Sequence, residues 1–585
     1  MPISKGQPVS NLSPATAQIP RHHLQSDPRQ PCSISVREVA MDRQAAGAQL
    51  LESLRGLFKA RRPAAAVCQA LGPLPSLDFS QESLTPSDCS VVAYILGCLE
   101  AVEKLGLDYL RCPLEELPPM AGDLHKCRSI SLQNSCLGES ALAIVTAAMK
   151  HPDCITRSLG LLCTGLTPRS CELLASVLRV TPSLSCLDLS ENEVGDRGVG
   201  ALCLALREPS CGLTTLRLKS CELSPDCCQG LGEVLCVNRT LTALDLGGNE
   251  LGDAGVELLC TGLQDQRTTL QKLLLYSNKL TDRACGPLSA LLKASPALRK
   301  LHLGSNNIGD AGMNKLSEAL GDSGCGIQKL CVYSNSLTAG CGEDLGRALA
   351  LTQSLTKLDL VCNELGDSGL RLLCPALRRP DCQLRTLWLL GNSLTTACCQ
   401  ELASTLSVNR SLLDLNLGYN KLGDRGVALL TAPLQQPDCQ IQTLWLIEND
   451  LTAACCSDLA TILRSGKLTE LHLGYNDLGD SGVREIWTAL SDGRCQLQSL
   501  LLMGASLTDG LRDDLTSTLC RSRTLTQLCL SENQFTDQSV DSFCRLLGSC
   551  STLKNIALYS NMFSLEGAQR LKLMECCRPG ITVEL

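Results

Sequence analysis

Histidine and cysteine are the side chains of this sequence best suited to binding a metal ion or to nucleophilic chemistry. The six histidines are scattered, and none forms the i, i+4 pair with a nearby carboxylate that zinc enzymes use. His302 and His472 occupy equivalent positions in a repeat of the sequence, which explains them without a ligand. We therefore predict neither a metal site nor a bound cofactor.

The cysteines are unusually numerous, at 37 in 585 residues. Adjacent pairs at Cys227–Cys228, Cys398–Cys399 and Cys455–Cys456 invite a metal or a redox interpretation. They lack the C-x-x-C…C-x-x-C spacing of a zinc site and recur in register with the repeat. We favour small buried residues of the core as their role.

Catalytic machinery is not recognisable in the sequence. No G-x-x-x-x-G-K-[ST] phosphate loop occurs, since Ser465-Gly466-Lys467-Leu468 lacks both the first glycine and the hydroxyl. The repeats also leave no segment over for a grafted enzymatic domain. We predict that this protein is not an enzyme.

Charge and hydrophobicity exclude several kinds of partner. A net charge of −8 argues against nucleic acid as the main partner. The N-terminus has no apolar signal-peptide core, and no apolar run approaches the roughly 18 residues of a membrane span. We expect a cytoplasmic protein, without a membrane or nucleic-acid partner, that is a monomer.

The repeat itself reads L-x-x-L-x-L-x-x-N-x-L. Its Asn position recurs at intervals that alternate between 28 and 29 residues, with a single 27 between Asn449 and Asn476. Sixteen clear copies run from Ser135 to Asn561, and two weaker ones are centred on Glu82 and Leu110. A fixed period of this length is the signature of a solenoid.

Each repeat encodes a strand followed by a returning helix. The L-x-L run predicts a strand, and the inward-facing Asn can bond the backbone groups of the following turn. We expect helix N-caps at the Asp of one repeat type, such as Asp480, and at the Thr of the other, such as Thr395. Ala254–Leu263 shows the helical spacing of apolar residues. The predicted fold class is α/β, a leucine-rich-repeat horseshoe with a parallel sheet inside and helices outside.

Four segments follow from this pattern. Residues 1–44 are rich in Pro, Ser, Gln and Arg and are predicted to be a disordered arm. Residues 45–124, with a helix over Ala45–Ala60 and the degenerate repeats, form an N-terminal cap. Residues 125–562 are the repeat array, and residues 563–585 form a C-terminal cap with a helix around Leu565–Cys576 and a strand at Ile581–Leu585.

Two repeat types alternate, L-D-L-x-x-N-x-L-G-D-x-G as at Leu244–Gly255 and L-x-L-x-x-N-x-L-T-x-x-C-C as at Leu387–Cys399. This alternation resembles the ribonuclease inhibitor family and, equally, the leucine-rich tail of NOD-like receptors of the NACHT, LRR and PYD type. The likeness covers about residues 125–585. It implies a protein-binding horseshoe, sensitive to oxidation of its thiols in the inhibitor case.

The resemblance can be compared with individual residues. Ribonuclease inhibitors carry Trp on concave strands, which Trp388 and Trp445 match, whereas Leu501 occupies a position where such a Trp could stand. Those inhibitors present a Tyr-Asp pair near their C-terminus, but here Ser560 follows Tyr559. They are also far more acidic. A complete NOD-like receptor would carry the phosphate loop that this chain lacks.

A concave binding site follows from the strand alternation, because the residues between the core leucines face inward. Large apolar side chains occupy these positions on every second strand, and most of the few aromatic residues lie on or beside the strands. Trp and Tyr dominate binding hot spots. The predicted partner-binding residues are Leu274, Tyr276, Tyr333, Trp388, Leu390, Tyr419, Trp445, Ile447, Tyr475, Leu501, Met503 and Tyr559.

Two functions remain open at this stage, both of a protein-binding scaffold. One is an inhibitor that occludes a pancreatic-type ribonuclease within the horseshoe. The other is a sensor or regulatory repeat region of innate immune, inflammasome-type signalling. The alternative to a binding interface is that these aromatic residues are incidental surface residues that were copied when the repeats were duplicated.

Overall fold

The computed structural model describes residues 36–72, 74–80, 82, 84–109, 118–263 and 268–585. A disordered arm was expected over residues 1–44, and its residues 1–35 lie outside the described residues. The Leu110 position of the second weak repeat also lies outside them. Within the described residues, no helix combines the length and the apolar composition needed to cross a membrane.

A single parallel sheet of nineteen strands runs through the described residues, each strand pairing with the next along the chain. Leu77 of β1 and Leu105 of β2 are paired in the sheet and lie five residues before Glu82 and Leu110, so both weak repeats are confirmed as strands. The strands are β1 Ser76–Asp78, β2 Val102–Gly106, β3 Cys127–Ser131, β4 Ser158–Gly160, β5 Cys186–Asp188, β6 Thr215–Arg217, β7 Ala243–Asp245, β8 Lys272–Leu274, β9 Lys300–His302, β10 Lys329–Cys331, β11 Lys357–Asp359, β12 Thr386–Trp388, β13 Asp414–Asn416, β14 Thr443–Trp445, β15 Glu470–His472, β16 Ser499–Leu501, β17 Gln527–Cys529, β18 Asn555–Ala557 and β19 Thr582–Glu584.

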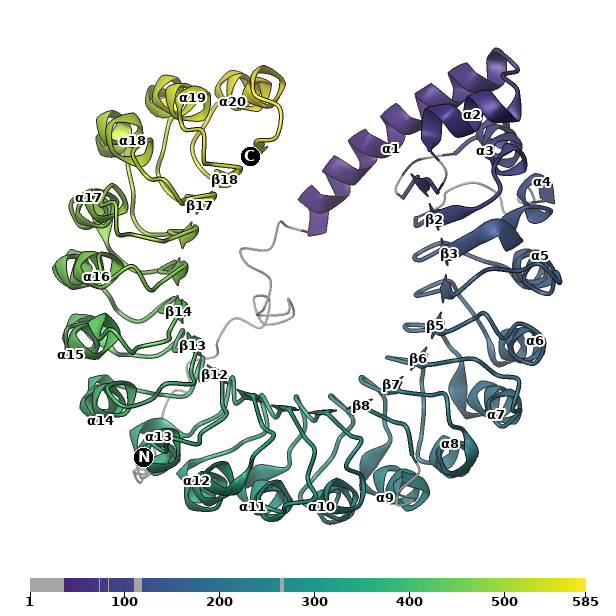
Figure 1. The fold of residues 1–585 in the computed structure, drawn as a ribbon, viewed down its shortest axis with the longest axis horizontal. Coiled ribbons are helices and arrows are strands. Elements are labelled where there is room, and N and C mark those ends of the chain that lie inside the picture. The colour runs from purple at the N-terminus through teal and green to yellow at the C-terminus, as the bar shows by residue number, and fades with distance from the viewer. Residues whose placement is uncertain (1–35, 73, 81, 83, 110–117, 264–267) are drawn as a thin grey trace, which may run out of the picture.

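Helices form an outer layer, and the sheet lines the inside of an almost closed horseshoe (Figure 1). Helices are about 10 Å wide whereas strands are about 4.8 Å apart, so the array bends towards the sheet. The helices are α1 Val36–Lys59, α2 Ala64–Leu71, α3 Pro86–Cys98, α4 Pro118–Ala121, α5 Glu139–Met149, α6 Pro168–Leu178, α7 Gly195–Leu206, α8 Asp226–Val237, α9 Gly252–Leu263, α10 Cys285–Ala294, α11 Gly309–Leu320, α12 Gly342–Leu351, α13 Gly366–Leu377, α14 Thr396–Leu406, α15 Gly423–Gln435, α16 Cys456–Leu463, α17 Gly479–Leu490, α18 Arg512–Leu519, α19 Val540–Ser549 and α20 Leu565–Cys577, with short 3-10 turns η3 Leu124–Lys126, η4 Ala339–Cys341, η5 Ala453–Cys455, η6 Asp509–Leu511 and η7 Asp537–Ser539.

Both ends of the array carry the helices that the sequence predicted. The helix expected over Ala45–Ala60 is α1, which already begins at Val36 and lies across the opening of the horseshoe (Figure 1). Leu54 on α1 is fully buried, and Arg55 forms a bidentate pair with Asp88 of α3 at 2.8 and 3.0 Å. β2 pairs with β3 in the same parallel way as later strands pair, so the sheet runs on across residue 124. The division between cap and array at that residue stays a prediction.

The Asn positions join consecutive repeats, as the sequence predicted. Asn192 is typical: its Nδ2 donates to the carbonyls of Leu161 at 2.7 Å and Leu189 at 2.9 Å. Its Oδ1 accepts the backbone N–H groups of Thr164 and Leu166 at 2.9 and 3.0 Å. One buried side chain thus satisfies backbone groups of two repeats that the turns leave unpaired.

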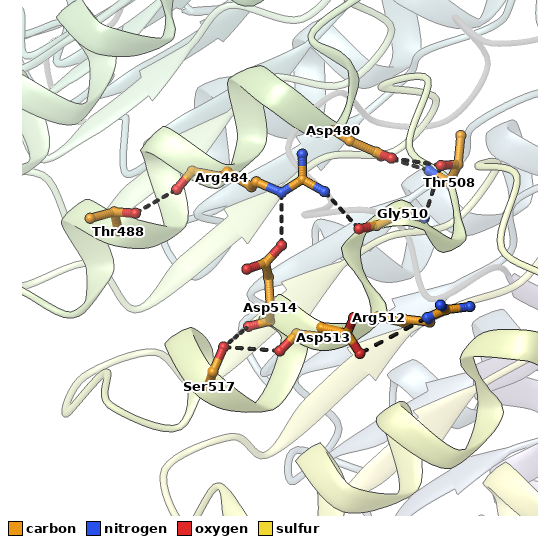
Figure 2. A network of polar contacts seen from close by, with 9 residues as sticks. All are labelled: Asp480, Arg484, Thr488, Thr508, Gly510, Arg512, Asp513, Asp514 and Ser517. Atoms are coloured by element: carbon orange, nitrogen blue, oxygen red, sulfur yellow. Dashed lines mark hydrogen bonds and ion pairs between the residues drawn. The ribbon is translucent and has the colours of Figure 1, made fainter.

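The N-cap prediction is right for Thr395, but wrong for Thr281, which precedes the turn before α10, and wrong for Asp480. The Thr395 hydroxyl caps α14 by accepting from the backbone N–H of Ala397. Asp480, in contrast, lies inside the first turn of α17, which begins at Gly479. Its carboxylate accepts from the N–H and the hydroxyl of Thr508 in the next repeat, at 2.9 and 2.6 Å (Figure 2). These Asp residues therefore tie one repeat to the next.

The core lies between sheet and helices and consists mostly of leucine, with the rings of Phe79, Trp487, Phe535 and Phe543 fully buried in it. Leucines at the strand centres are fully buried, and Val256, Leu259 and Leu263 of α9 pack onto them as expected. Cys398 and Cys399 are 1% and 0% exposed, and the Cys398 thiol donates to the carbonyl of Thr395 at 3.1 Å. This placement confirms the core interpretation of the paired cysteines.

Candidate functional site

The concave face consists of three rows of side chains, because alternate residues of a strand point to the same side. Row 1 precedes the central leucine of each strand, row 2 follows it directly, and row 3 lies two residues further on. On β13 these positions are Asp414, Asn416 and Gly418, which flank the fully buried Leu415 and Leu417. The sequence prediction used rows 2 and 3, added Tyr419 and Tyr475, which directly follow row 3, and omitted row 1.

An aromatic cluster occupies the middle of this face. We call it the central cluster, and its strand positions run from β10 to β13. Trp388 and Leu390 are only 4% and 6% exposed within it, whereas its two tyrosines are half-buried. Its members are Tyr333, Val361, Cys362, Trp388, Leu390 and Tyr419.

Asp414 joins the two concave tryptophans. The indole N–H of Trp388 donates to Oδ2 at 2.9 Å, and that of Trp445 donates to Oδ1 at 3.2 Å. Burial raises the pKa of Asp414, while the two indole donors and nearby Lys357 act in the opposite direction. The Lys357 ammonium lies 3.0 Å from the centroid of the Trp388 ring, a cation–π contact. The indoles are thus held in fixed orientations.

His472 lies beneath the second tryptophan. The imidazole stacks on the Trp445 ring with centroids 3.6 Å apart and planes 13° from parallel. Its side chain is fully buried, and a carboxylate oxygen of Glu470 lies 3.8 Å from Nε2. Burial lowers the pKa of His472, so the ring is neutral at neutral pH. Within the described residues neither ring nitrogen has a hydrogen-bond partner.

A row of rings leads from β8 into the central cluster. Tyr276 and His302 have centroids 4.9 Å apart, and His302 and Tyr333 are 5.3 Å apart, edge to face. The tyrosine rings lie over glycines on the preceding strands: a Cβ on Gly247 would stand 2.2 Å from Tyr276, and one on Gly304 would stand 2.4 Å from Tyr333. Row 3 glycine in one repeat type therefore makes room for tyrosine in the other.

A second group of apolar residues lies at the C-terminal end of the concave face. Leu501, Cys529 and Ala557 are buried there, with Met503 and Tyr559 packed against them. The Tyr559 hydroxyl lies 3.4 Å from the Met503 sulfur. Nearby, the hydroxyl of Tyr475, which follows β15, donates to Glu532, which follows β17, at 3.0 Å.

Most of the predicted site residues therefore lie in two groups. Tyr333, Trp388, Leu390 and Tyr419 meet in the central cluster, with Tyr276 joined to it through His302 and Trp445 through Asp414. Leu501, Met503 and Tyr559 meet at the C-terminal end. Leu274, Ile447 and Tyr475 belong to neither group, although all three are half-buried on the same face.

Four of the predicted partner-binding residues, Trp388, Leu390, Trp445 and Leu501, are almost fully buried. Strands about 4.8 Å apart let a large side chain cover its neighbour, so these four have little surface of their own to offer a partner. Asp414 and Lys357 were missed altogether. The strand alternation that places row 2 on the concave face also places row 1 there, so the concave positions of Asp414 and Lys357 could have been predicted from the sequence.

No cluster of three potential metal ligands occurs among the residues that the structure describes. The arrangement on the concave face offers ring faces, hydroxyl groups and charged groups on a rigid sheet. Such groups can recognise a partner by shape, hydrogen bonding and charge.

Comparison with known proteins agrees with this architecture. A family model described as Leucine Rich repeat matches residues 181–203, 237–260, 294–317, 353–374, 408–430 and 466–486. The ribonuclease inhibitor of Sus scrofa is 39% identical over 424 residues, which are 72% of this chain and 92% of that protein. The chain belongs to the ribonuclease inhibitor family of leucine-rich-repeat proteins. The Mus musculus ribonuclease inhibitor is 36% identical over the same shares of the two chains.

The second resemblance is confirmed as well. The human NACHT, LRR and PYD domains-containing protein 14 is 38% identical over 374 residues. That match covers 64% of this chain and 34% of that protein. The likeness to the receptors thus extends over about a third of their length.

Proposed function

We propose that this member of the ribonuclease inhibitor family is a non-catalytic scaffold that holds a protein partner on its concave face. The observation that carries the proposal is the central cluster, which places scarce aromatic residues on the inner surface and not in the core. Solenoids provide extended concave surfaces of this kind. We further expect the protein to act in the cytoplasm.

The tyrosines are the proposed contact residues of the central cluster. Tyr333 and Tyr419 are half-buried and still have surface to lose to a partner, whereas Trp388 has almost none. We assign a supporting role to Trp388, on which Tyr333 and Tyr419 pack and which Asp414 and Lys357 hold in place. A surface whose side chains are already ordered loses less conformational entropy when it binds.

Substitution of both tyrosines tests the concave site. Tyr333→Ala with Tyr419→Ala should weaken partner binding by about 2 kcal/mol or more per hot-spot residue, measured by isothermal titration. Tyr109→Ala is the matched control, since Tyr109 occupies the position of Tyr419 in an early repeat and is 44% exposed. If the double variant and the control bind the partner with equal affinity, the proposal that the partner binds on the concave face is wrong.

A pancreatic-type ribonuclease is the first partner to test. The match to the Sus scrofa inhibitor over 92% of its length favours it. Leu501 and Ser560 depart from the inhibitor pattern at the C-terminal end. Titration of the purified protein against the nuclease, with RNA cleavage as readout, should show stoichiometric inhibition. Full nuclease activity at micromolar concentration of this protein would exclude an inhibitor and favour the second candidate.

That second candidate is a regulatory or sensing role in innate immune signalling. The matches to NACHT, LRR and PYD domains-containing proteins favour it. Both candidates use the same concave surface, so the tyrosine variants apply to either one.

A further inference from the structure

A cleft outside the concave face opens at the edge of the horseshoe where the strands begin. Its volume is about 620 Å³, and small-molecule sites occupy about 300–1,000 Å³. Loops of two neighbouring repeats form it, one leading from α17 to β16 and the other from α18 to β17. We call it the rim cleft, and the charged and amide side chains that line it are Asp492, Gln496, Arg521 and Arg523.

Arg521 departs from the pattern of earlier repeats. It lies four residues before the buried Leu525, in the loop that leads to the strand. A cation just after a helix complements the helix dipole. Other helices of the array end without one, however, because five earlier repeats with a loop of the same length have an apolar residue at this position: Val180, Val237, Ala294, Leu351 and Val408.

Arg523 differs from Arg410, which occupies the same loop position in an earlier repeat. Arg410 donates to two carbonyls of its own loop at 3.0 and 3.1 Å and pairs with Asp438 of the next loop at 3.4 Å. After Arg523, the next loop has Cys550 where Asp438 stands. Neither Arg523 nor Arg521 has an ion pair or a side-chain hydrogen bond among the residues that the structure describes, and both are exposed. Their guanidinium groups are therefore available to a ligand.

The other loop of the rim cleft adds a further positive charge. Arg494 stands there at the position that Asp438 holds in an earlier repeat. It forms a bidentate pair with Asp492, at 3.2 and 3.1 Å, and Asp492 is the one acidic residue among the described residues that line the cleft. The charge of Asp492 is thus already matched, and the two lining arginines stay uncompensated on a chain whose net charge is −8.

Gln496 supplies an amide group to the rim cleft. The matching Gln440 donates to the carbonyl of Asp438 at 3.1 Å, whereas the amide of Gln496 has no hydrogen bond within the described part of the chain. No described residue that lines the cleft is aromatic, so a nucleobase would find no ring to stack on. An amide beside a carboxylate suits the hydroxyl groups of a polyol, because both can accept and the amide can also donate.

We infer that the rim cleft binds a phosphorylated polyol, a sugar or inositol phosphate, whose phosphate groups lie on Arg521 and Arg523. A planar guanidinium donates two parallel hydrogen bonds to phosphate oxygens, and such charge-assisted pairs are strong. The polyol hydroxyls would bond with Gln496 and Asp492. This site is separate from the concave face, so it adds a small-molecule ligand to a protein-binding scaffold.

Isothermal titration of the full chain with inositol hexakisphosphate, at physiological ionic strength, tests the rim cleft. We expect saturable binding of one ligand per chain. Arg521→Val with Arg523→Gln introduces the residue types that Val408 and Gln353 provide at these positions in earlier repeats, so the fold should persist. The affinity of this double variant should fall at least about tenfold, because charge-assisted hydrogen bonds are lost.

Arg239→Gln with Arg410→Gln is the matched control. It removes the same charge at the position of Arg523 in two other repeats and should leave the affinity within about twofold. Thermal melting checks that both variants are folded. No saturable binding, equal losses in the two variants, or equal affinity for inositol hexasulfate would overturn the inference, and tighter binding of adenosine triphosphate would exclude a polyol ligand.

Vesicles distinguish the two sources of a polyol phosphate. Flotation with phosphatidylcholine vesicles, with and without phosphatidylinositol bisphosphate, shows whether the ligand is a lipid headgroup. Capture by the phosphoinositide vesicles that is lost in Arg521→Val with Arg523→Gln would support a headgroup at the rim cleft. Binding of the free polyol phosphate without vesicle capture would support a soluble ligand, and binding of neither would overturn the inference.

Discussion

Replacing Asp414 by alanine removes the acceptor that two buried indoles share. Its carboxylate accepts from Trp388 at 2.9 Å and from Trp445 at 3.2 Å, on β12 and β14 either side of β13. A buried donor left without an acceptor costs about 1–3 kcal/mol, so two donors cost about 2–6 kcal/mol. Burial raises the pKa of Asp414, which shows that placing the carboxylate there is itself unfavourable. Removing it recovers part of the cost, and we expect a net loss of about 2–4 kcal/mol.

Native-state hydrogen exchange of the β12–β14 backbone is the appropriate assay. Long repeat arrays do not unfold in a single two-state step, so a local opening free energy is better defined than a global one. Asp414→Asn keeps one acceptor for one indole and should lose about half as much as Asp414→Ala. A change below about 0.5 kcal/mol for Asp414→Ala, or equal losses for the two variants, would refute the account of the indole pair.

Three further predictions follow from buried groups. Because burial lowers the pKa of His472, the unfolded chain takes up a proton near pH 6.5 that the folded chain does not. Stability should therefore fall as the pH drops through about 6.5, with a slope that approaches about 1.4 kcal/mol per pH unit at about one pH unit lower. In thermal melts His472→Asn should lack this part of the slope, and identical slopes would contradict the account. Iodoacetamide should label the exposed Cys576 and Cys577 of the folded protein and reach Cys398 only after denaturation, which peptide mass spectrometry would detect, and early labelling of Cys398 would show that the core interpretation is wrong. Asn420→Ala should lower the local opening free energy, measured by hydrogen exchange, by about 3–5 kcal/mol, because it leaves two backbone N–H groups and three carbonyls without a partner. A loss under about 1 kcal/mol would contradict the account of how the Asn residues join consecutive repeats.

The architecture was predictable because each repeat contains the sequence signals for its own strand, turn and helix. The period, the central leucines and the Asn positions defined the strands, including the weak ones at Leu77 and Leu105. The function of Asp480 was not predictable from local rules. Its partner Thr508 lies in the next repeat, so a residue that looks like an N-cap in one repeat acts between two.

The positions of the concave side chains were predictable, but their packing was not. Strand alternation placed Trp388 and Tyr333 on the inner face, where they lie. Whether a ring there is exposed depends on its neighbours in space, and Asp414 and Lys357 cover Trp388 from strands about one repeat away.

The central claim is that the concave face binds a protein. Quantitative affinity capture from a cytosolic extract, with wild type, Tyr333→Ala with Tyr419→Ala, and Tyr109→Ala as equally loaded baits, tests it most directly. The account predicts at least one captured protein whose yield falls about tenfold or more with the double variant and is unchanged with Tyr109→Ala. Captured proteins whose yields are equal for all three baits would contradict concave-face binding.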